Sequence, residues 1–161
     1  MPATPLMLAH RLFPARIESR DGVDRPALWI FTAIVLVKTV ISVNSIINGH
    51  TVVSTADGIP LDTYSPAAAQ TIVSVFALLS LSNLMLCLLC VLAIVRYRAM
   101  IPLMFTVLLL QALARYAVLG FLPIPRTGAP PGTAINAVLL ALTLAGLALS
   151  LRGAGKLQRA G

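Results

Sequence analysis

The stretch ALWIFTAIVLVKTVISVNSIIN, residues 27–48, decides the fold of this chain. Its one charged side chain is Lys38, and it contains neither Asp nor Glu. A helix of about 20 apolar residues spans the ~30 Å hydrocarbon core of a bilayer. Three further stretches share this character. Together they predict four transmembrane helices, at residues 27–48, 66–95, 101–122 and 133–151.

The composition of the 161 residues supports the same class of protein. The chain is 58% hydrophobic and 11% charged, whereas soluble domains are about 25% charged. A net charge of +7 would suit nucleic-acid binding, but the cations flank the apolar stretches and do not cover a polar domain. We therefore exclude nucleic acid and expect membrane lipids as partners, because basic side chains at a membrane surface attract anionic headgroups.

The positions of the basic side chains predict the orientation. Arg96 and Arg98 lie between the second and third stretches, and both the amphiphilic segment 1–26 and the tail 152–161 are rich in Arg and Lys. The connector 49–65 has two Asp and no Lys or Arg. The positive-inside bias then places both termini in the cytoplasm. The expected fold is all-α, a four-transmembrane-helix up-down-up-down bundle.

Two cations inside the apolar stretches, Lys38 and Arg115, are the clearest functional signal. An ionisable side chain at membrane depth is costly and needs a partner or a wet cavity. On helices, Ser42 lies one turn from Lys38, Gln111 lies one turn from Arg115, and Asn83 lies near mid-depth. These five residues predict a ligand-binding site in the bundle interior for an anion or a carbonyl group, such as a lipid or a quinone.

A second interpretation needs no ligand. Arg115 extends outward and pairs with a loop carboxylate, Asp57 or Asp62, while Lys38 bonds to Ser, Asn and backbone oxygens. The sequence leaves both interpretations open.

The pair Cys87 and Cys90 has the C-x-x-C spacing of thiol redox motifs. A membrane thiol–quinone redox protein is therefore an alternative function. Against it, the pair lies in an apolar stretch that keeps thiols unreactive, and the chain has no second pair to relay electrons. We expect no metal site, because the two histidines, His10 and His50, lie on opposite sides of the predicted membrane.

Small side chains follow one face of the fourth stretch. Such a face permits close helix packing, either within the bundle or in a homodimer or larger membrane complex. It consists of Ala134, Ala137, Ala141, Ala145 and Ala148.

The topology, the Arg96-Tyr97-Arg98 hairpin and Arg115 late in the third stretch resemble the DoxX-like class of small four-helix bacterial membrane proteins. The resemblance covers residues 27–151 and implies a multi-pass inner-membrane protein. Some members of that class are associated with thiol or sulfur oxidation. No catalytic residue carries over, so the sequence favours a non-catalytic accessory or small-ligand-binding bundle. A small transporter subunit is a further alternative.

Overall fold

A computed structural model describes residues 25–158, with side-chain surroundings as far as Leu151. Within this range most residues are helical, and no strand occurs. Four of its helices are long and apolar enough to cross a membrane, which confirms the all-α prediction at that level. The helices are α2 (Arg25–Ile47), α4 (Pro66–Arg96), α5 (Ile101–Phe121) and α6 (Pro131–Gln158). Of the predicted amphiphilic segment 1–26, residues 1–24 lie outside the described residues, and Arg25 and Pro26 begin α2.

Local signals fix where α4 begins. Ser65 is its N-cap, and the Ser65 Oγ accepts a hydrogen bond from the Ala68 backbone N–H at 3.3 Å. Pro66 follows as the first helical residue, where its missing N–H costs nothing. The sequence predicts this start. The fourth helix begins earlier than the predicted stretch, at Pro131, because a proline is well suited to the first turn.

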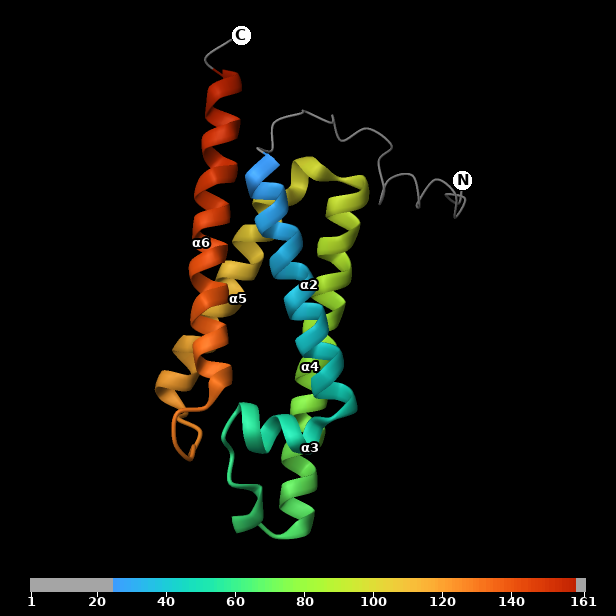
Figure 1. Ribbon diagram of the computed structural model, residues 1–161, viewed down its shortest axis with the longest axis vertical. Coiled ribbons are helices and arrows are strands. Elements are labelled where there is room, and N and C mark those ends of the chain that lie inside the picture. The colour runs from blue at the N-terminus through green and yellow to red at the C-terminus, as the bar shows by residue number, and fades with distance from the viewer. Residues whose placement is uncertain (1–24, 159–161) are drawn as a thin grey trace, which may run out of the picture.

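The long helices pack unevenly. α2 lies against α4 on one side and α6 on the other, and α5 packs mainly on α6. Figure 1 shows α5 starting beside the end of α4 and running diagonally to the start of α6. The core between them includes an edge-on aromatic pair, Phe31 and Phe105, with ring centroids 4.8 Å apart. Backbone contact of α5 with α4 is much less extensive than its contact with α6.

The buried face of α2 has a regular spacing. Ala27, Phe31, Ile34, Ser42 and Ser45 are buried, at steps of three and four residues apart from one gap. Lys38 falls in that gap, so it occupies a core-facing register position and is only partly exposed. This register brings the charged side chain to the inner face of the bundle.

The connector between α2 and α4 folds into a cap. It forms α3 (Gly49–Thr51), a π-helical turn η1 (Val52–Ala56) and a 3-10 turn η2 (Leu61–Thr63). Its buried side chains pack against the first turns of α4 and against Ile124 of the α5–α6 connector. The cap therefore covers the part of α4 that exceeds the length of a bilayer span. Those side chains are Val53, Ile59 and Leu61.

Two glycines join the cap to the α5–α6 connector and α6. Gly58 has φ +70°, a conformation that side chains with a Cβ rarely adopt, and its carbonyl accepts the Thr127 N–H at 2.8 Å. A Cβ at Gly132 would lie 2.6 Å from the carbonyl oxygen of Ala56. The absence of a side chain at Gly132 lets the end of η1 rest on the first turn of α6.

The side of α6 that faces the bundle differs from its alanine face. Leu139, Thr143, Gly146 and Ser150 are buried, again at steps of three and four. The five alanines from Ala134 to Ala148 are exposed. The small residues that pack within the bundle are thus Thr143, Gly146 and Ser150.

We predict that Gly146→Ala destabilises the protein and that Gly120→Ala does not. A Cβ at Gly146 would lie 2.4 Å from Cζ of the buried Phe105, whereas one at Gly120 meets nothing within 4 Å. Overpacking costs about 1–3 kcal/mol, of which helix propensity returns at most about 1 kcal/mol. SDS-induced unfolding followed by circular dichroism measures both variants. Equal stability of the two variants would show that Phe105 moves aside freely.

Candidate functional site

A directed chain of hydrogen bonds joins three helices in the bundle interior. Gln111 on α5 donates from Nε2 to Asn83 Oδ1 on α4 at 3.3 Å. Asn83 in turn donates from Nδ2 to Ser42 Oγ on α2. Ser42 donates to the carbonyl oxygen of Lys38 at 2.8 Å. Three of the five predicted ligand-binding residues are thus brought together, and they bind one another.

One atom of this chain lacks a partner. Gln111 Oε1 is buried and accepts no hydrogen bond in the described part of the protein. An unsatisfied buried acceptor costs about 1–3 kcal/mol. The remaining groups of Ser42, Asn83 and Gln111 are paired. Their bonds tie α2, α4 and α5 together where apolar packing between α4 and α5 is slight.

Lys38 lies beside this chain but contributes only its backbone carbonyl to it. No hydrogen bond or ion pair of its ammonium group occurs among the described residues. Its charge is within electrostatic range of Cys87 and Cys90 on α4 and of Arg115 on α5. Lys38 therefore has no partner of opposite charge among the described residues.

Arg115 takes no part in the interior chain. Its Nη2 lies 3.8 Å from Oδ1 of Asp57, the ion pair found within residues 25–151. The other loop carboxylate, Asp62, is exposed and pairs with none of the described cations. Asp57 is placed opposite Arg115 by the cap, through the contacts at Gly58 and Gly132. The five predicted residues consequently divide into an interior group and one outward-pointing arginine.

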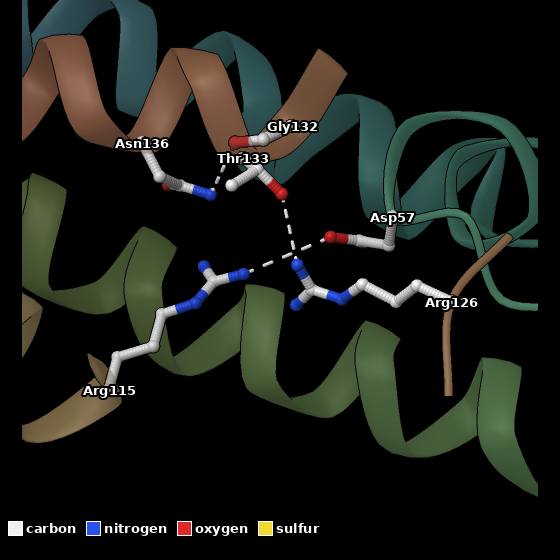
Figure 2. A network of polar contacts seen from close by, with 6 residues as sticks. All are labelled: Asp57, Arg115, Arg126, Gly132, Thr133 and Asn136. Carbon is white, nitrogen blue, oxygen red and sulfur yellow. Dashed lines mark hydrogen bonds and ion pairs between the residues drawn. The ribbon is translucent and has the colours of Figure 1, made fainter. Parts of the chain in front are cut away.

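A second arginine, which the sequence reasoning missed, approaches the same carboxylate. Figure 2 shows Arg115 and Arg126 converging on Asp57 from α5 and from the α5–α6 connector. Arg126 donates from Nη1 to Thr133 Oγ1 on α6 at 3.0 Å. A signal existed, because Arg126 is the lone cation of a Pro- and Gly-rich connector. We call Asp57, Arg115 and Arg126 the outer charge cluster.

The charges of this cluster do not balance. Asp57 pairs with Arg115 and lies within electrostatic range of Arg126, which forms no ion pair with it. The first turn of α6 adds the partial positive charge of a helix N-terminus. Burial raises the pKa of Asp57 above its usual range, and the positive charges of Arg115 and Arg126 partly oppose that shift. Arg115 makes no hydrogen bond to the described residues, so most guanidinium N–H groups are free to bind other acceptors.

An open groove of about 290 Å³ adjoins Arg126. Its other walls are the side chains of Tyr116, Leu119, Pro123 and Ile124. A smaller hollow continues from it to Arg115, Thr133 and Asn136. The outer charge cluster and the groove thus form one site with a cationic end and an apolar end.

The two cysteines occupy a different place. Cys87 and Cys90 are 1% and 0% exposed and carry free thiols within the core. Among residues 25–151, no group of three or more His, Cys, Asp or Glu side chains is positioned to hold a metal ion. Burial of this degree separates both thiols from any soluble redox partner.

Comparison with known proteins adds no family to these observations. No family model, no curated protein and no solved structure matches this chain. The functional argument therefore rests on the geometry of the site.

We predict that Asn83→Leu lowers the free energy of unfolding by about 1–2 kcal/mol. The variant loses two hydrogen bonds between helices, and each such bond contributes about 0.6 kcal/mol on average in membrane proteins. Gln70→Leu on the same helix is the control, because Gln70 is exposed. SDS-induced unfolding measures the difference. Equal stability of both variants would mean that the interior chain does not hold the helices together.

Proposed function

We propose that this chain is a multi-pass inner-membrane protein whose four helices alternate in direction, with both termini in the cytoplasm. The four long apolar helices and their many exposed Leu, Val and Ile side chains support membrane insertion. The basic residues Arg96 and Arg98 on one side, against Asp57 and Asp62 on the other, support the orientation.

Labelling with a membrane-impermeant maleimide tests this topology in right-side-out spheroplasts. Asp62→Cys is expected to react in intact spheroplasts, and Ala99→Cys only after permeabilisation, since both positions are exposed on opposite connectors. The unmodified protein is the control. Its buried Cys87 and Cys90 are expected to stay unlabelled. Reaction of Ala99→Cys from outside would reverse the orientation, and labelling of the native thiols would revive the redox alternative.

We propose further that the bundle is a non-catalytic accessory protein that binds a small anionic ligand at the outer charge cluster. The observation that carries this proposal is the surplus of guanidinium donors around one carboxylate. Arg115 has a side chain that is 49% exposed, and its ion pair at 3.8 Å is longer than a hydrogen bond. Two arginines with free N–H groups are suited to a phosphate or carboxylate.

The interior hydrogen bonds of Ser42, Asn83 and Gln111 support placing the ligand at the outer charge cluster. Ser42, Asn83 and Gln111 use their polar groups on one another, so they have few left for a ligand. The two residues that keep free donors and accessible surface are Arg115 and Arg126. Binding is therefore more favourable at the end of α5 than at mid-depth.

Native mass spectrometry from mild detergent tests ligand binding. The unmodified protein is expected to retain an anionic small molecule, and Arg115→Gln with Arg126→Gln is expected to lose it, because the paired change removes both cations. Arg98→Gln is the control, since Arg98 is exposed on the opposite connector. Equal retention by all forms would place the ligand elsewhere. A bare unmodified protein would remove the binding proposal.

A further inference from the structure

The groove next to the outer charge cluster identifies the chemistry of the ligand. Its walls are formed by Tyr116, Leu119, Pro123 and Ile124, and Arg126 closes one end. A free inorganic anion would use the cationic end and leave the apolar walls uncovered. A molecule that uses both ends is amphipathic, with an anionic head and an apolar body.

The surroundings of the groove match a lipid at the membrane surface. The neighbouring side chains Phe121 and Leu122, where α5 ends, are 86% and 70% exposed. An arginine near a helix end commonly reaches toward the headgroup region. A phosphate group there can accept two parallel N–H bonds from a guanidinium, which a carboxylate 3.8 Å away does not do.

We propose that the ligand is an anionic phospholipid, whose phosphate replaces Asp57 as the partner of Arg115 while its apolar body lies in the groove beside Tyr116 and Leu119. This inference rests on the proposed anion-binding function. In this proposal Asp57 competes with the phosphate for Arg115. The carboxylate neutralises part of the cluster in the empty site, and the phosphate must overcome its repulsion to bind.

The structure shows why Asp57 can act in this way. The cap fixes its backbone through the Gly58–Thr127 hydrogen bond and the close contact of Ala56 with Gly132, so its position does not depend on Arg115. Its side chain is 18% exposed and makes no hydrogen bond to the described residues. The carboxylate can therefore give up Arg115 without unfolding the cap.

The competition has a defined pH dependence. The charged groups near Asp57 are Arg115 from α5 and Arg126 from the connector, while α6 presents the neutral side chains of Thr133 and Asn136. Neither arginine titrates in the physiological range. Burial raises the pKa of Asp57, so acidification neutralises it sooner than an ordinary carboxyl. A neutral Asp57 no longer repels phosphate, so binding is expected to tighten as the pH is lowered.

The test is a titration in detergent with short-chain phosphatidylglycerol, followed by native mass spectrometry, with phosphatidylcholine and inorganic phosphate as comparison probes. The unmodified protein is expected to prefer phosphatidylglycerol. Asp57→Asn is expected to tighten phosphatidylglycerol binding roughly fivefold at pH 7.5, the size of an exposed charge interaction, and to abolish the pH dependence. Asp62→Asn is the matched control and is expected to bind as the unmodified protein does.

A second variant tests the groove without touching the charges. Leu119→Trp fills the space beside Arg126 and is expected to lose phosphatidylglycerol binding while any binding of inorganic phosphate remains. Equal or weaker phosphatidylglycerol binding by a folded Asp57→Asn variant overturns the competitor role but leaves anion binding intact. Binding of inorganic phosphate as tightly as phosphatidylglycerol overturns the lipid assignment. Failure of every probe to bind removes the proposed function itself.

Discussion

Polar side chains between the helices must form hydrogen bonds with one another, because their apolar surroundings offer no water. Asn83 meets this constraint for three helices at once, by accepting from Gln111 and donating to Ser42. These bonds connect α4 with α5, although α5 has much less backbone contact with α4 than with α6. Because these amide and hydroxyl groups satisfy one another except at Gln111 Oε1, the bundle interior has little capacity left for a polar ligand.

The same constraint explains the separation of Lys38 and Arg115, the two cations within the long apolar helices. Arg115 is one helical turn beyond Gln111, close enough to the end of α5 for its guanidinium to reach the cap and Asp57. Lys38 lies too deep in the buried register of α2 to do so, and it has no charged partner in the described chain. A cation that reaches the surface can take part in binding, whereas one held at mid-depth serves mainly through its backbone and stem.

Apolar patterning was sufficient to predict the four long helices, and Ser65 followed by Pro66 was sufficient to predict the start of α4. The sequence could not predict which polar residues bond in the interior and which belong to the outer charge cluster. That division depends on how the connectors fold. The position of Asp57 follows from a positive φ at Gly58 and from the close approach of η1 to Gly132. Helical spacing carries no information about contacts of that kind.

The outer charge cluster also shows that an ion pair need not stabilise the fold. At 3.8 Å, with one partner half exposed, the Arg115–Asp57 pair adds little to stability. Burial disfavours the ionised form of Asp57, which raises its pKa even with two arginines nearby. A carboxylate that is costly to bury and loosely paired is better understood as a replaceable counter-ion. Its position near an apolar groove suits the proposed exchange of an internal anion for an external one.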